Sequence, residues 1–281
     1  MFQARTTSVE KYDLSGNLID SQTVDFRTTN ALRPFAAGNA NMCVKNGVLG
    51  LFFNTEWYHD ENGTNHQGIV TCMFDADDLT LKQCWNNEGS HSFGNTAIVT
   101  DYGMAVLQMG DAYSRAVNLN TYKIDSPDSI IESYLGANGD TNIFTSPGTY
   151  EGDGNPTYCQ LGNVAESEST MAFSGSGTRE FTSGIFKNSS SKTGKYDAFI
   201  IIKDKSLSEK FSEDIGGETR IDAKTGNNVD SNIFWLTDSA HDSGLVPGQT
   251  KLVTLDDGSY CVLWEEWRNG KFESLKYEIL D

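Results

Sequence analysis

Three stretches of this 281-residue chain share one pattern: NMCVKNGVLGLFFN at 41–54, NTAIVTDYGMAVLQMG at 95–110 and TKLVTLDDGSYCVLWEE at 250–266. In each, a short apolar strand runs into a turn with glycine, and a second apolar strand leads to a polar or acidic cluster. The turn glycines are Gly47, Gly103 and Gly258. The first two are about 56 residues apart, a length that suits one blade of a β-propeller.

Similar strand signals recur along the rest of the chain, punctuated by Gly, Asn, Asp and Ser, and no long amphipathic helix is indicated. The sequence therefore predicts an all-β fold, with residues 1–281 forming a single domain. The repeat favours a β-propeller of about five blades. Four or six blades are alternatives, and a pair of β-sandwiches is the competing architecture.

Two further features bear on this architecture. Residues 137–157 are rich in Gly, Asn, Asp, Thr and Pro, a composition that predicts a long surface loop. The first and last strand-like segments, at 8–20 and 270–281, have a similar composition and both end at Asp. We expect the two termini to complete one blade together, because unpaired strand edges are prone to aggregation.

The composition excludes some partners. Asp and Glu number 39 against 21 Lys and Arg, and the resulting net charge of −18 disfavours a nucleic acid partner. The sequence contains no apolar run of the length that a membrane helix needs, so membrane insertion is not expected. The N-terminus lacks the apolar centre of a signal peptide, but a mature chain begins after its signal has been removed, so an extracellular location stays open.

The five cysteines contain no CxxC pair and no spacing typical of zinc sites, so no metal centre is predicted from them. Cys72 and Cys84 could face each other across a hairpin, either as a disulfide or as free buried cysteines. No cofactor is expected, except that Asp-rich turns at 75–78 and 151–155 could bind calcium. Turn formation explains both segments more simply.

The densest group of polar residues lies in NHQG at 65–68, GSHSFGN at 89–95 and QMGDAYSR at 108–115. Imidazole, carboxylate and guanidinium groups on the loops of one propeller face could bind a polar ligand through charge-assisted hydrogen bonds. Alternatively, these side chains bond to neighbouring backbone and fasten one blade to the next. The candidate ligand-binding residues of this group are His66, His91, Asp111 and Arg115.

These motifs, with LWEEW at 263–267, resemble those of uncharacterised bacterial β-propeller proteins that are often found in secreted multidomain chains. The resemblance covers about 65–120 and, more weakly, 232–268. It implies a propeller and an extracellular or cell-surface setting, and it brings no established reaction. This sequence has Ser114 where the family pattern has Pro before the Arg.

Aromatic residues beside carboxylates form a second group. Sugar faces stack on aromatic rings while sugar hydroxyls bond to polar groups, so this composition suits a glycan. Trp264 is expected to point into the core instead. The candidate glycan-binding residues of this group are Trp57, Tyr58, Glu265 and Trp267.

The chain lacks a G-x-S-x-G nucleophile elbow, an H-E-x-x-H zinc helix, a P-loop and a dinucleotide-binding fingerprint. No sequence signature pairs two carboxylates for glycoside hydrolysis either. No catalytic residues are therefore assigned. The sequence favours a non-catalytic secreted or surface-associated module that binds a glycan. The alternatives are a glycoside hydrolase or lyase on a propeller scaffold, and a protein-interaction platform in a larger chain.

Overall fold

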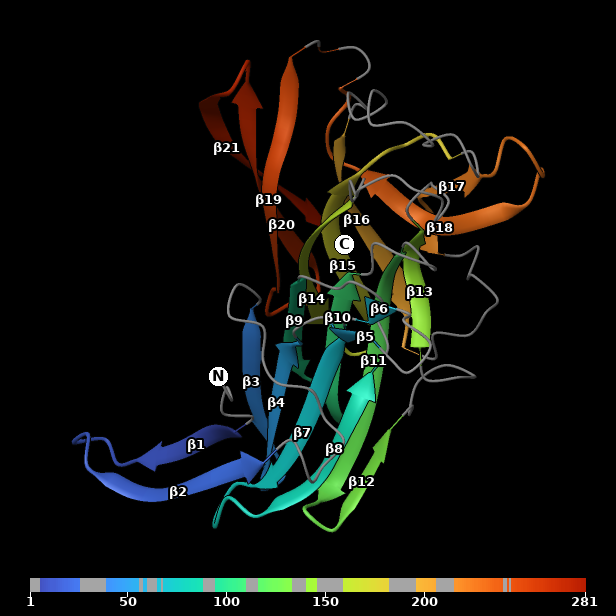
Figure 1. Cartoon of the computed structure of the whole chain (residues 1–281). Helices are drawn as coiled ribbons and strands as arrows, with labels where there is room; N and C mark the ends of the chain where they lie inside the picture. Colours follow the sequence, from blue (N-terminus) through green and yellow to red (C-terminus); the bar gives the residue numbers. More distant parts are fainter. Residues whose placement is uncertain are drawn as a thin grey trace. The chain divides into compact units, whose positions relative to one another are not determined.

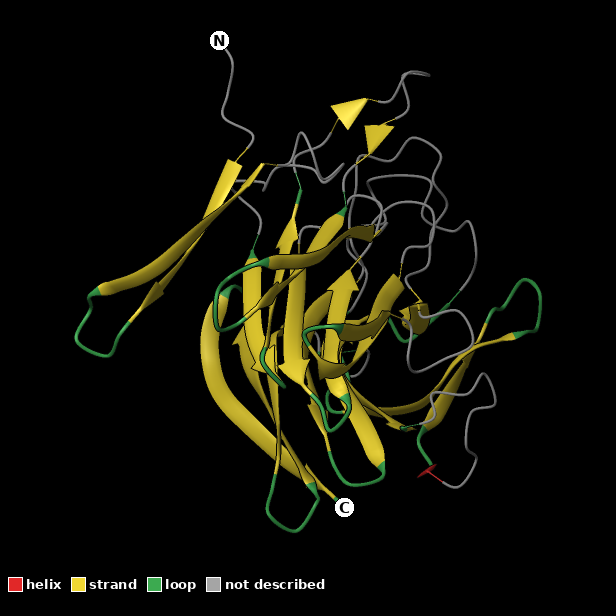
Figure 2. Cartoon of the chain, turned by 90° about the horizontal axis from the view of Figure 1, so that it is seen from below, coloured by secondary structure: helices red, strands yellow, loops and turns green. Residues whose placement is uncertain are grey.

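We analysed a computed structural model of the chain. It describes residues 6–25, 39–55, 58–59, 65–66, 68–87, 94–109, 116–132, 140–145, 159–181, 196–205, 215–239, 242 and 244–281. These residues form an all-β fold, and the described ranges contain no α-helix; the short red segment in Figure 2 is a 3₁₀ turn at Ile215. Accordingly, this part of the chain has no helix long and apolar enough to cross a membrane.

The described strands form four antiparallel sheets of three to five strands and two two-stranded ribbons (Figure 1). The ribbons are β1 (Thr6–Tyr12) with β2 (Leu18–Asp25), and β5 (Tyr58–His59) with β6 (Asn65–His66). The first sheet has the order β3 (Ala40–Lys45), β4 (Val48–Asn54), β7 (Ile69–Asp75), β8 (Leu81–Asn87). In the second sheet, β9 (Gly94–Val99), β10 (Gly103–Met109), β11 (Ala116–Ser126) and β12 (Ser129–Glu132) are neighbours in chain order, and β13 (Asp140–Thr145) pairs with β11.

The third sheet has the order β14 (Cys159–Glu166), β15 (Thr170–Gly177), β16 (Asp197–Asp204), β18 (Asn228–Trp235), β17 (Glu218–Ile221). The fourth comprises β19 (Leu245–Thr254), β20 (Tyr260–Arg268) and β21 (Lys271–Leu280). The chain divides into two compact units. One comprises residues 1–106 and 121–134, and the other comprises residues 107–120 and 135–281.

The three stretches quoted first each form the opening hairpin of a sheet, namely β3–β4, β9–β10 and β19–β20. Asn46 and Gly47 have φ values of 49° and 77°, which is the left-handed pair that a tight two-residue hairpin turn requires. Gly103 is needed for a different reason. A Cβ atom there would lie 1.9 Å from the carbonyl oxygen of Tyr122, so only glycine lets the two strands approach so closely.

In the first unit, the β3–β4–β7–β8 sheet is buried on both faces. Leu51 and Phe53 of β4 pack with residues of β1 and β2 on one face. Val48 and Phe52 of the same strand pack with β10, β11 and β12 on the other. Because successive side chains of a strand alternate between faces, burial of both faces requires a continuous apolar run, and VLGLFF supplies it.

In the second unit, the β14–β18 sheet is likewise covered on both faces. Ala198, Ile200 and Ile202 of β16 pack against residues of β19 and β20. Phe199, which points the other way, stacks on Phe144 of β13 with ring centroids 4.3 Å apart. Each unit therefore has a central sheet sandwiched between neighbours, which explains why apolar runs recur along the chain.

Part of the segment expected to be a long loop near 137–157 is a strand. Within it, Asp140–Thr145 forms β13, because Ile143 and Phe144 are an apolar pair that is 1% and 0% exposed. The polar composition of the surrounding residues hid this short strand. The remainder of the expected loop lies outside the described residues. The described terminal strands β1 and β21 belong to different sheets, so the completion of one blade by the two termini stays a prediction.

The long connections of the first sheet lie at one end of its strands. The last residue of β4 pairs with the first residue of β7, which in turn pairs with the last residue of β8. The chain segments that leave the sheet at this end comprise residues 55–68 and 88–93. At the other end, β3 and β4 are joined by Asn46 and Gly47 alone. Of the predicted residues, His66 lies within the first of these connections, on β6, whereas Trp57 and His91 lie outside the described residues.

Candidate functional site

The structure places some of the predicted site residues. Tyr58 and His66 are paired in register on the β5–β6 ribbon. Glu265 and Trp267 lie on β20. The remaining four lie outside the described residues: Trp57, His91, Asp111 and Arg115.

Three buried amide side chains lie on the strands that flank Asp111 and Arg115 in sequence. Gln108 is on β10, and Asn118 and Asn120 are on the neighbouring strand β11, with 1%, 6% and 4% of each residue exposed. Their amide oxygens have no hydrogen-bond partner among the described residues. Such oxygens normally accept a bond from water or a ligand. The polar character that the sequence showed here therefore extends into the strands.

Glu265 and Trp267, two of the predicted glycan-binding residues, contact each other. The indole Nε1 of Trp267 donates a 2.8 Å hydrogen bond to the Oε2 of Glu265, and its ring meets Phe272 edge-on at 5.7 Å. A Cβ at Gly248 would lie 2.5 Å from that carboxylate oxygen, so the Glu265 side chain occupies the space that a side chain at position 248 would need. Trp264 is 6% exposed and belongs to the core, as expected.

A richer group of charged and aromatic residues lies on the β14–β18 sheet. Trp235, at the end of β18, is partly exposed, and the guanidinium of Arg179 lies 5.0 Å from its ring centroid. The indole also meets Phe144 and Phe199 edge-on, at 6.2 and 5.8 Å. The tryptophan is thus held in one orientation by a cation and two rings, while part of its surface remains open to solvent.

Arg179 bridges two carboxylates. Its Nε lies 3.1 Å from Oδ2 of Asp197, and its Nη1 lies 3.9 Å from Oε1 of Glu218. Contact with one guanidinium keeps the two carboxyls within about 10 Å of each other, and the carboxyl pairs of glycosidases lie roughly 5 to 9.5 Å apart. The Asp197 side chain is 3% exposed, whereas that of Glu218 is 65% exposed.

Asp197 is held by further donors. Its Oδ1 accepts bonds from the hydroxyl of Thr237 at 2.9 Å and from the backbone N–H of Ser239 at 2.7 Å. The carboxylate therefore has one fixed position, and through the ion pair it also fixes Arg179. Glu218 is the carboxyl of this group that a solvent-borne molecule can reach. We call Arg179, Asp197, Glu218 and Trp235 the Trp235 cluster.

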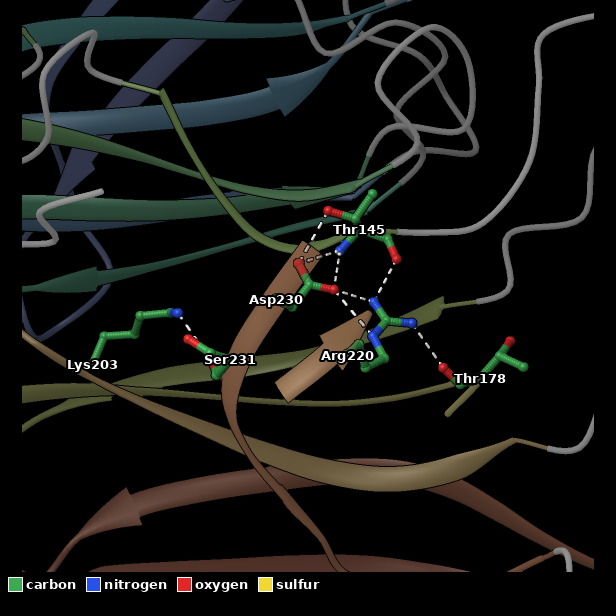
Figure 3. Close-up of polar contacts among 6 residues, drawn as sticks. All are labelled: Thr145, Thr178, Lys203, Arg220, Asp230 and Ser231. Carbon is green, nitrogen blue, oxygen red and sulfur yellow. Dashed lines mark hydrogen bonds and ion pairs between the residues drawn. The ribbon is translucent and has the colours of Figure 1, made fainter. Parts of the chain in front are cut away.

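A buried ion pair supports the same sheet. Arg220 and Asp230 are 4% and 1% exposed, and their side chains form a salt bridge between β17 and β18 (Figure 3). Asp230 also accepts bonds from the backbone N–H and the hydroxyl of Thr145. The Nη1 of Arg220 donates a 2.8 Å hydrogen bond to the carbonyl oxygen of Thr178. These bonds connect the ends of β13 and β15 to β17 and β18. The ion pair therefore stabilises the arrangement of these four strands.

The guanidinium of Arg220 is also 3.7 Å from the ring centroid of Phe144, the residue that contacts Trp235. Phe144 thus joins the buried pair to the Trp235 cluster. Loss of the ion pair would therefore disturb the tryptophan as well as the strands.

Lys203 is a second buried charge on this sheet. It is 5% exposed, and its Nζ donates a 3.2 Å bond to the carbonyl oxygen of Ser231 (Figure 3). Burial lowers the pKa of Lys203 to about 8, although the charge of Asp230 opposes this shift. The folded protein therefore releases this proton more readily than the unfolded chain does.

The lowered pKa predicts a pH dependence of stability. Between pH 8 and 10 the unfolded chain still binds the Lys203 proton while the folded protein has lost it, so unfolding becomes less favourable as pH rises. We expect the free energy of unfolding of the wild type, relative to Lys203→Met, to rise by about 2 to 3 kcal/mol across this window. Urea unfolding of both proteins at pH 7, 8, 9 and 10 measures the difference. A constant difference would contradict it.

No group of three or more His, Cys, Asp or Glu side chains among the described residues could hold a metal ion. Of the two Asp-rich turns, 151–155 lies outside these residues. In the other, Asp75 and Asp78 each accept a backbone N–H two residues ahead, as turn-forming aspartates do. Calcium binding stays a prediction.

The sequence interpretation did not single out Arg179, Asp197 or Glu218. One signal was present: Asp197 and Lys203 flank the run AFIII directly, and Asp230 lies two residues before NIF. A charge at the edge of an apolar strand is normally paired when buried. The identity of each partner depended on which strands became neighbours.

No family model matches this chain, and no curated protein matches it. Similar solved structures include an α-L-arabinanase of Cellvibrio cellulosa, at 10% identity over 99% of this chain and 89% of that one, with a TM-score of 0.44. A PL25 ulvan lyase, solved bound to a GlcA(1-4)Rha3S saccharide, has 10% identity over 99% of this chain and 67% of that one, with a TM-score of 0.48. An endo-arabinase of Bacteroides thetaiotaomicron has 11% identity over 86% and 73%, with a TM-score of 0.38.

The comparisons correct one expectation from the sequence. The non-catalytic binding module is wrong as the favoured function, because the similar structures are of enzymes: arabinanases and a polysaccharide lyase. At identities near 10% the likeness concerns the fold alone, so any activity of this chain has to be argued from its own residues.

Proposed function

We propose that this protein cleaves a polysaccharide, as a glycoside hydrolase or a polysaccharide lyase. The observation that carries the proposal is the Trp235 cluster, in which one guanidinium bridges two carboxylates beside a partly exposed indole. An aromatic face stacks on the apolar face of a sugar ring, and the charged groups bond to its hydroxyls or to a uronate carboxylate.

Asp197 is buried and Glu218 is exposed, so the two carboxylates of the Trp235 cluster suit different roles. Glu218 is exposed, so its carboxyl can reach a bound glycosidic oxygen and donate or accept a proton there. Asp197 is buried and accepts bonds from Arg179, Thr237 and Ser239, so it acts by positioning Arg179. Arg179, once fixed, orients the sugar against Trp235. Hydrolysis needs a second reacting carboxylate or an activated water, and lyase chemistry needs a base beside a uronate.

The scaffold that we propose is a five-bladed β-propeller. Each unit contains a sheet buried on both faces by neighbouring sheets, as the blades of a propeller are. The family resemblance of the GDAYSR and NHQG motifs supports the same architecture and an extracellular or cell-surface location. His66, His91, Asp111 and Arg115 would then provide further contacts to the glycan from the connecting segments.

Cleavage of a polysaccharide panel tests the proposal. The purified chain is incubated with neutral arabinan and xylan and with uronate-containing polysaccharides, and both reducing ends and the ultraviolet absorbance of unsaturated uronides are followed. New reducing ends without absorbance indicate hydrolysis, and both signals together indicate a lyase. Absence of both signals on every substrate, from a protein that is folded by circular dichroism, would contradict the proposal.

A further inference from the structure

Two cysteines face each other across neighbouring strands of the first sheet. In the antiparallel register of β7 and β8, Cys72 lies directly opposite Cys84. Their Sγ atoms are 2.7 Å apart, which is closer than two sulfur atoms that merely pack. Directly opposed residues of antiparallel strands have Cα atoms about 4.5 to 5.5 Å apart, within the range of about 4.4 to 6.8 Å that disulfides span.

We propose that Cys72 and Cys84 form a disulfide bond that fastens the edge strand β8 to the sheet. Strand β8 is paired only with β7 among the described strands, and its end at residue 87 leads into the segment that contains His91. A covalent link at Cys84 would prevent the detachment of this strand. It would thus keep β8 paired with β7.

The surroundings favour oxidation in a defined order. Cys72 is 0% exposed and lies in the core cluster with β1 and β2, whereas Cys84 is only partly buried. The hydrogen bond between the thiols raises the pKa of Cys72, with burial as a further cause, and lowers the pKa of Cys84. Cys84 is therefore the thiol that an external oxidant can reach as a thiolate.

A small-molecule disulfide such as oxidised glutathione is the oxidant that we infer. The Cys84 thiolate attacks one sulfur of the oxidant, which releases one glutathione thiolate and leaves a mixed disulfide. The sulfur of Cys72 then attacks the Sγ of Cys84 and displaces the second glutathione. The two protein thiols lose two electrons and two protons, and the oxidant gains them as two thiols.

Peptide mapping of the full chain tests the proposal directly. Trypsin cleaves after Lys45, Lys82 and Arg115, so Cys72 and Cys84 fall on separate peptides, 46–82 and 83–115, with no other cysteine in either. After incubation of the folded protein with oxidised glutathione, we expect one linked species of these two peptides, which separates on reduction. Of the five cysteines, three should remain open to alkylation. Separate peptides, or a glutathione adduct that persists on Cys84, would overturn the proposal.

Thermal unfolding provides a second measurement. A disulfide that closes a loop of this size should raise the melting temperature of the oxidised protein by about 5 to 10 °C over the reduced protein. Cys84→Ala should abolish this redox-dependent shift. Cys43→Ala is the matched control and should retain it, because Cys43 lies opposite Gly50 and burial raises its pKa to about 11. An equal shift in Cys84→Ala would overturn the proposal, and if that variant does not fold, the peptide map of the wild type decides.

Discussion

Glu218→Gln should lower the turnover number for polysaccharide cleavage by about 10²- to 10⁴-fold, the range that general acid–base catalysis contributes. The substitution keeps the shape of the side chain but removes the group that could donate or accept the proton. Glu218 is exposed on β17, so folding should be unaffected and KM should change little. The measurement is the initial rate of reducing-end or unsaturated-product release on the best substrate of the panel.

Glu180→Gln is the matched control, because Glu180 is an exposed acid next to Arg179 in sequence. It should retain the rate of the wild type. Asp197→Asn separates positioning from catalysis. With Arg179 no longer fixed, KM should rise more than the turnover number falls. Equal rates for Glu218→Gln and the wild type would show that Glu218 is not the proton-transferring group, even if the protein cleaves polysaccharides.

Arg220→Met should destabilise the protein by about 3 to 5 kcal/mol, because it leaves the carboxylate of Asp230 buried without its cation. Asp230 would retain only the bonds from Thr145, and Arg220 would no longer hold the carbonyl of Thr178. The fluorescence of Trp235 should change in the folded variant, because Phe144 links the pair to this ring. Urea and thermal unfolding, followed by fluorescence and circular dichroism, measure both effects.

Two comparisons make this prediction sharper. The double variant Arg220→Met/Asp230→Leu should recover part of the loss, since neither member of this ion pair is then left as an unpaired buried charge. Arg268→Met is the control for an exposed ion pair with Asp242 and Glu273, and it should hardly change the unfolding midpoint. If Arg220→Met behaved like Arg268→Met, the buried pair would not fasten the strands as the contacts indicate.

Much of the fold could be predicted from the sequence because its strands are apolar runs of the length that a doubly covered sheet requires. The runs VLGLFF, IVTCMF and AFIII all lie within strands, and the turn with Gly47 joins its two strands as expected. Strand β13 was missed because only Ile143 and Phe144 are buried in an otherwise polar segment. Two apolar residues give too weak a periodicity to distinguish a strand from a loop.

The sequence by itself determined the all-β class, because alternation, apolar runs and turn residues act within a few positions of one another. It also put Glu265 and Trp267 into one group of aromatic and acidic residues, and the structure shows a hydrogen bond between these two side chains. The Trp235 cluster depended on tertiary structure, since Arg179, Asp197, Glu218 and Trp235 come from four separate places in the chain. Only the order of strands in the sheet brings these charges within bonding distance, and no local pattern encodes that order.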